Sequence, residues 1–87
     1  MDYLIDTNVL VRAVDRGDSA CRTARSGLRK LMEGRHRLYI LPQITAEFWV
    51  VCTRPKEKNG LGYKPAQVQR YITHFEALFA ILLETEL

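Results

Sequence analysis

The stretch that decides the fold is Tyr3-Leu4-Ile5-Asp6-Thr7-Asn8, close to the beginning of the chain. Three bulky residues predict a short buried strand, which ends abruptly at a carboxylate, a hydroxyl and an amide. An apolar pattern at helical spacing follows. Ligands of open parallel α/β sheets collect at the carboxyl ends of the strands, so Asp6 is the first candidate functional residue.

Helical and strand patterns alternate along the rest of the chain. Four helices are expected, one directly after Asn8 and three at about 20–33, 42–53 and from 65 onward. Pro42 and Pro65 open the last two, and Arg54-Pro55 ends the third. Apolar residues at helical spacing are expected to form the buried stripes of the last three helices: Ala20, Ala24, Leu28 and Leu31; Ile44, Phe48, Val51 and Cys52; and Val68, Tyr71, Ile72, Phe75 and Leu78. Strands are expected at 3–5, 38–41 and 79–83, and a flexible basic loop at 54–64. The alternation predicts an α/β fold with a parallel sheet and right-handed crossovers, formed by a single domain over residues 1–87.

Composition restricts the function classes. The 87 residues are 47% hydrophobic, with a net charge of +3 and a pI near 9.1, which suits an anionic partner such as RNA. No stretch approaches the ~18 apolar residues of a membrane span, and no signal sequence is recognisable. Cys21 and Cys52 lie far apart without zinc-site spacing, so we expect reduced, partly buried thiols and a cytoplasmic protein.

Several residues have simpler interpretations than a functional one. His36 and His74 have no nearby ligand partners and are expected at the surface. Arg22, Arg25 and Arg29 share a helix face, which favours a solvated surface over an RNA contact.

Glu47 is the second candidate functional residue. It lies one turn into a helix that begins where the second strand ends, so it faces the same sheet edge as Asp6. Two neighbouring carboxylates repel each other unless a cation neutralises them, and Mg²⁺ or Mn²⁺ prefers such oxygen ligands. Taken singly, Asp6 could instead cap a helix, and Glu47 could be an exposed helical glutamate.

Competing catalytic motifs are missing. A haloacid-dehalogenase-type phosphatase needs an aspartate where Asn8 stands, and no glycine-rich phosphate loop follows the first strand. Glu47 has no histidine four residues away for a zinc site, and no Ser-His-Asp set is apparent.

Two segments, Leu4-Ile5-Asp6-Thr7-Asn8-Val9-Leu10 and Ile44-Thr45-Ala46-Glu47-Phe48-Trp49-Val50, resemble the amino-terminal half of a PIN domain. The nearest type is the toxin component of bacterial VapBC toxin–antitoxin pairs. The resemblance implies a three-layer α/β/α fold, a cognate antitoxin, and a Mg²⁺- or Mn²⁺-dependent endoribonuclease. It makes Asp6 and Glu47 the catalytic metal ligands.

The resemblance also implies supporting roles. Thr7 or Asn8 would orient Asp6, because ligating carboxylates usually need a hydrogen-bonding partner. The ion would position and ionise a water for attack on an RNA phosphodiester. Arg12, Lys56 and Lys58 are candidate RNA-binding residues.

The chain departs from the family pattern at its end. The family's remaining acids come later, in a helix typically reading Asp-Ala-x-Leu-x-Ala and near a further strand, and Glu84 and Glu86 do not lie in that motif. Two carboxylates hold Mg²⁺ weakly. The first strand, central in the family, becomes an exposed apolar edge that invites pairing with another chain. We therefore expect a fold truncated after the third strand, weak or absent catalysis, and homo-oligomers.

The sequence leaves alternatives open. A catalytically inactive PIN-like remnant would bind RNA or a protein through its basic loop, and a purely structural α/β fragment would bind neither metal nor RNA. The chain could be a truncation, a frameshift product or a genuinely short protein.

Overall fold

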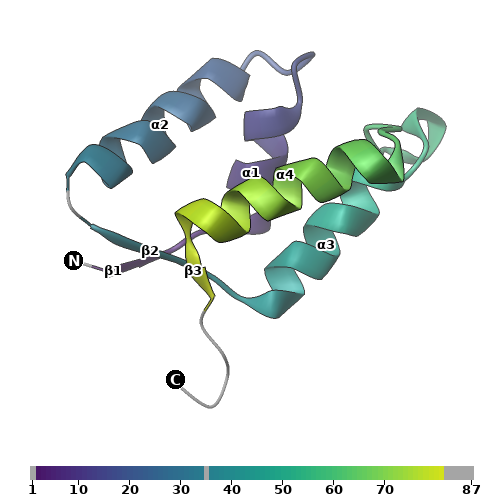
Figure 1. Ribbon diagram of the computed structural model, residues 1–87. Coiled ribbons are helices and arrows are strands. Elements are labelled where there is room, and N and C mark those ends of the chain that lie inside the picture. Colours follow the sequence, from purple (N-terminus) through teal and green to yellow (C-terminus); the bar gives the residue numbers. More distant parts are fainter. Residues whose placement is uncertain (1, 35, 82–87) are drawn as a thin grey trace.

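The computed structural model describes residues 2–34 and 36–81 (Figure 1). Its elements in chain order are β1 (Asp2–Leu4), α1 (Thr7–Val14), α2 (Cys21–Glu33), β2 (Arg37–Ile40), α3 (Pro42–Thr53), the 3-10 turn η1 (Lys56–Lys58), α4 (Pro65–Leu78) and β3 (Ala80–Ile81). The expected order of strands and helices is confirmed, with boundaries within a few residues of those expected. Glu84 and Glu86 lie outside the described residues.

The three strands form one parallel sheet in the order β1-β2-β3. Tyr3 is in register with Leu38, and Tyr39 is in register with both Leu4 and Ala80. The ladder continues one residue past β1, where the Ile5 amide donates to the Tyr39 carbonyl at 2.9 Å. β1 therefore forms one edge of the described sheet, and its carboxyl end stands beside that of β2.

Helices cover only one face of the described sheet. Ile5, Leu38 and Ile40 point into the core, whereas Leu4, on the opposite face, is 55% exposed. Right-handed crossovers that advance in one direction across a sheet place every connecting helix on the same face. The three-layer arrangement is thus not seen in residues 2–34 and 36–81, which form one helical layer on one sheet.

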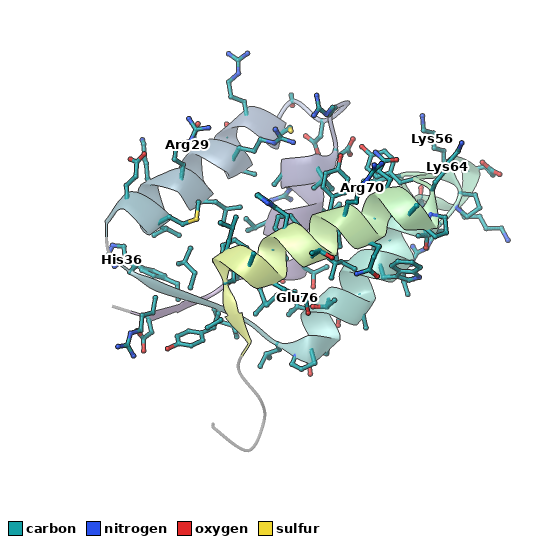
Figure 2. All side chains as sticks on the ribbon, in the orientation of Figure 1. Arg29, His36, Lys56, Lys64, Arg70 and Glu76 are labelled. Atoms are coloured by element: carbon teal, nitrogen blue, oxygen red, sulfur yellow. The ribbon has the colours of Figure 1, made fainter. Side chains whose placement is uncertain are left out.

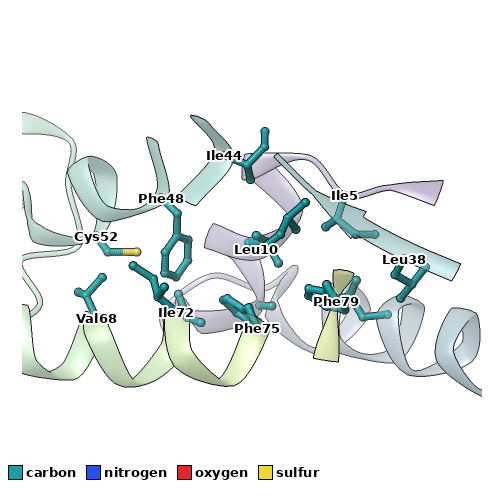
Figure 3. Close-up of a cluster of buried hydrophobic side chains, with 14 residues drawn as sticks. Ile5, Leu10, Leu38, Ile44, Phe48, Cys52, Val68, Ile72, Phe75 and Phe79 are labelled. Carbon is teal, nitrogen blue, oxygen red and sulfur yellow. The ribbon is translucent and has the colours of Figure 1, made fainter. Parts of the chain in front are cut away.

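A single hydrophobic core joins all four helices to the sheet (Figure 3). Leu10, Phe48 and Val68 are its largest helical side chains with almost no exposure. Phe48 and Phe75 meet edge to face, with ring centroids 5.4 Å apart. Proline stands at the start of α3 and of α4, where its fixed φ favours the first helical turn.

The expected buried stripes are confirmed at their centres but not throughout. On α2 only Leu28 is fully buried, and Leu78, expected to point inward from α4, is 43% exposed. His36 is not the surface residue that was expected, because it is half-buried with its ring edge-on to Tyr3 at 5.1 Å. His74 is exposed, as expected.

The 54–64 segment is tied to α3 by backbone hydrogen bonds. The amide of Leu61 donates to Val51 at 3.1 Å, and that of Tyr63 donates to Cys52 at 2.9 Å. The Tyr63 hydroxyl donates to the Val14 carbonyl at 2.7 Å, which also ties the segment to α1. The segment is therefore not the flexible loop that was expected. Gly62 and Asn59 have left-handed backbone conformations, which let the chain turn so that these hydrogen bonds can form.

No helix within the described residues is long and apolar enough to cross a membrane.

Candidate metal site between α1 and α3

Asp6 stands between β1 and α1, where the chain changes from extended to helical backbone. Its own backbone is extended, with φ −81° and ψ 150°, and its carbonyl accepts from Val9 at 3.2 Å. The Asp6 side chain makes no capping hydrogen bond to the helix, and the residue is exposed. Its carboxylate therefore lies at the strand end without the capping role that is its simplest structural explanation.

Glu47 reaches the same place from the second turn of α3. Its Oε2 accepts a hydrogen bond from the Thr7 hydroxyl at 2.8 Å, across forty positions of sequence. Thr7 is only 7% exposed, so its rotamer is fixed by packing and its hydroxyl holds the carboxylate in one orientation. The sequence predicted that Thr7 or Asn8 would orient Asp6, whereas the hydrogen bond joins Thr7 to the other acid.

A shallow open hollow of about 440 Å³ contains both acids. Asp6, Thr7 and Asn8 line it from the start of α1. The facing wall belongs to α3 and its end, and consists of Ala46, Glu47, Val50, Val51 and Arg54. The fold thus brings together the four site residues that the sequence placed around the strand end.

The donor set fits a hydrated hard cation. Carboxylate oxygens are the ligands that Mg²⁺ and Mn²⁺ prefer, and Mg²⁺ commonly keeps several waters while using one or two carboxylates. No group of three or more histidine, cysteine, aspartate or glutamate side chains forms a metal site within the described part of the chain. Asp6 and Glu47 are the two carboxylates that line the hollow, so they are the residues that could hold such an ion.

Arg54 is the functional candidate that sequence reasoning missed. It follows the last residue of α3, seven positions after Glu47, and lines the same hollow. A spacing of seven places two residues on the same face of a helix, so this signal was present in the sequence. Of the three predicted RNA-binding cations, none lines this hollow directly. Arg12 is exposed on α1, whereas Lys56 and Lys58 lie in η1 beyond α3.

Neither the protein-family models nor the curated proteins include a match to this chain.

Proposed function

We propose that this chain is a metal-dependent endoribonuclease of the PIN type, most similar to the toxin of a toxin–antitoxin pair. One observation carries the proposal. Asp6 and Glu47, forty-one residues apart, line one hollow at the carboxyl end of a parallel sheet, and Glu47 accepts a hydrogen bond there from the hydroxyl of the buried residue Thr7. Neither a helix-capping role for Asp6 nor a solvent-exposed position for Glu47 would require the two side chains to line the same hollow.

The chain's own residues have distinct roles in this proposal. Asp6 and Glu47 would hold Mg²⁺ or Mn²⁺, and the bound ion would polarise the phosphate of the substrate and ionise a water. Thr7 fixes the orientation of Glu47 through its 2.8 Å hydrogen bond. Arg54 adds a positive charge to the same hollow, which favours a phosphodiester over an uncharged ligand.

The architecture of the described residues is compatible with one part of that fold. The strand order β1-β2-β3 leaves β1 at an edge, and one face of the sheet carries no helix among the described residues. In a complete PIN-like three-layer domain, further strands would continue beyond β1 and further helices would cover this face. Two carboxylates are a small donor set for Mg²⁺, so we expect weak ion binding and low activity.

The metal site is tested by thermal unfolding with Mn²⁺. At ten times the Kd, an ion that binds only the native state stabilises it by about 1.4 kcal/mol. In a domain of this size that raises Tm by roughly 6–11 °C. We expect Glu47→Gln to abolish the shift, whereas Glu76→Gln, an equal change on the exposed face of α4, preserves it. A shift that survives in Glu47→Gln places the ion elsewhere and contradicts the proposal.

Activity is tested separately with a labelled RNA. We expect slow Mn²⁺-dependent cleavage that Asp6→Asn abolishes. A second candidate function, a non-catalytic module that binds RNA or a protein, is favoured by the hydrogen-bonded basic segment at 54–64. Absence of any Mn²⁺ effect at millimolar concentration, with RNA binding retained, would establish that alternative.

A further inference from the structure

A second hollow, of about 470 Å³, lies beyond the acidic pair where α1 ends. Arg16 and Lys56 line it from opposite sides, together with Tyr63. Asp15 also lines it, and its Oδ1 accepts from the Gly17 amide at 3.2 Å. The hollow therefore presents two cations for one carboxylate that already has a hydrogen-bond partner.

The same two segments form the walls of both hollows. On one side, α1 contributes Asn8 to the first hollow, and the turn after α1 contributes Arg16 to the second. On the other side, Arg54 at the end of α3 lines the first hollow, and Lys56 in η1 lines the second. The two hollows share no lining residue, but they follow each other along the seam where α1 packs against α3. We name the two hollows and the seam between them the α1/α3 groove.

Charge changes sign along the α1/α3 groove. Asp6 and Glu47 line the first hollow together with Arg54, so two negative charges face one positive charge there. Arg16 and Lys56 line the second hollow together with Asp15, so two positive charges face one negative charge there. Arg12 is exposed on α1 four positions after Asn8, so it lies on the same face of the helix as Asn8. This distribution of charge suits a nucleic-acid strand in which one phosphate lies at a metal ion and the neighbouring phosphates contact the cationic side chains.

The cationic end is pre-organised. The amide of Gly62 donates to the Arg54 carbonyl at 2.8 Å, and the Tyr63 hydroxyl donates to the Val14 carbonyl at 2.7 Å. These bonds fix the backbone that carries Arg54 and Lys56 relative to α1. Less conformational entropy is then lost when a ligand binds than if the segment were free.

We propose that the α1/α3 groove is the path of a single RNA strand that extends from the acidic pair to Arg16 and Lys56. The inference rests on the proposed ribonuclease function and specifies how that site holds its substrate. The eight residues of α1 rise about 12 Å, which matches roughly three to four stacked nucleotides at 3.4 Å each. Tyr63 offers an aromatic ring at the cationic end on which a base can stack.

Binding is measured without catalysis, by fluorescence anisotropy of a labelled 12-nucleotide oligouridylate in EDTA. We expect Arg54→Ala, and the double variant Arg16→Ala/Lys56→Ala, each to raise Kd about 3- to 10-fold at low salt. Single-stranded binding loses affinity with a slope near −0.7 per phosphate contact in a plot of log K against log salt. The slope should therefore flatten by about 0.7 for the single variant and about 1.4 for the double variant.

Arg70→Ala is the matched control. Arg70 is exposed on α4 (Figure 2) and lines neither hollow. Its replacement by alanine removes one positive charge, as Arg54→Ala does. We expect its Kd to change less than twofold. An equal loss of affinity in Arg70→Ala would show that only the net charge attracts the RNA, and would contradict the proposed path. Unchanged affinity in both groove variants, with native Tm values, would also contradict it.

The outcomes separate the path from the ribonuclease function. RNA binding that depends on the groove residues, without Mn²⁺-dependent cleavage, would support the RNA path and contradict the ribonuclease function. Cleavage that requires Asp6 and Glu47, but is insensitive to Arg54, Arg16 and Lys56, retains the enzyme and rejects the path. A duplex RNA that binds as tightly as the single strand, with the same dependence on the groove variants, also contradicts a path for one strand.

Discussion

Thr7 illustrates at the scale of one residue how the core positions the candidate site. Thr7 is buried at the start of α1, and its hydroxyl donates to the Glu47 carboxylate in the open hollow. A side chain anchored in this way moves less than one that extends freely from a surface helix. Thr7 therefore both packs in the core and orients the Glu47 carboxylate.

Thr7→Val tests this role because valine keeps the buried shape and removes the hydroxyl. We expect a loss of about 0.5–1.5 kcal/mol in the free energy of unfolding, typical of one hydrogen bond. The Mn²⁺-induced increase in Tm should also become smaller, because Glu47 is no longer held. Thr7→Ser, which keeps the hydroxyl, should retain most of the metal effect. Equal metal effects in Thr7→Val and the unmodified protein would show that Thr7 only stabilises the fold.

Cys52 shows the opposite case, a reactive group type that the fold makes inert. Burial, with a smaller contribution from the charge of Asp15, raises the pKa of Cys52 from 9.0 to about 12. At pH 8.5 we expect iodoacetamide to modify the half-buried Cys21 and to spare Cys52 until urea unfolds the chain, as read by mass spectrometry. In a Cys21→Ser variant the native protein should take up no label.

The same pKa shift predicts how stability depends on alkaline pH. The native state holds the Cys52 proton more tightly than the unfolded state, so this stabilisation is complete below about pH 9. It is lost progressively as the pH rises from about 9 toward 12. Burial also raises the pKa of Tyr63, which acts in the same direction.

At the scale of elements, the sequence predicted what local chemistry determines. Prolines marked the starts of α3 and α4, and Arg54-Pro55 marked the end of α3, because proline restricts both itself and the residue before it. Apolar spacing identified the inward residues Phe48 and Val68. Asp6 and Glu47 were paired on topology alone, and both do line one hollow.

What the sequence could not predict depends on contacts between elements. Leu78 continues the apolar stripe of α4 yet is exposed. Tertiary packing, and not the stripe itself, decides whether a neighbouring element covers such a residue. The Thr7 hydroxyl had two carboxylates within reach, and only the crossing of α1 with α3 selects Glu47. The 54–64 segment has loop composition, but its bonds to α3 join residues ten or eleven positions apart and leave no pattern in the sequence.

Gly60 gives the segment its tight fit. A Cβ at this position would collide with the backbone of Arg54, whereas a Cβ on Gly27 of α2 meets nothing within 4 Å. We expect Gly60→Ala to lower the free energy of unfolding by about 1–3 kcal/mol through overpacking. Gly27→Ala should raise it by about 0.5–1 kcal/mol, because alanine is the better helix former. Urea titration measures both, and similar values for the two variants would contradict a fixed segment.

At the scale of the whole molecule, the chain is asymmetric. Within residues 2–34 and 36–81 the strands advance in one direction, so the four helices share one face and the other face presents Leu4 and Tyr39. Leu4 belongs to β1, the strand at one edge of the described sheet. Its side chain is exposed, and strand alternation turns its backbone groups away from β2. An apolar open edge of this kind favours pairing with another chain.

Self-association through this edge is therefore expected, as the sequence predicted. Sedimentation velocity over a 100-fold concentration range should show reversible association that Leu4→Lys reduces, because a charge on an edge strand opposes pairing. Leu78→Lys makes the same substitution at a leucine of similar exposure on α4, and should leave the association unchanged. If Leu78→Lys alone dissociates the assembly, the contact lies between helices and the sheet edge is not the interface.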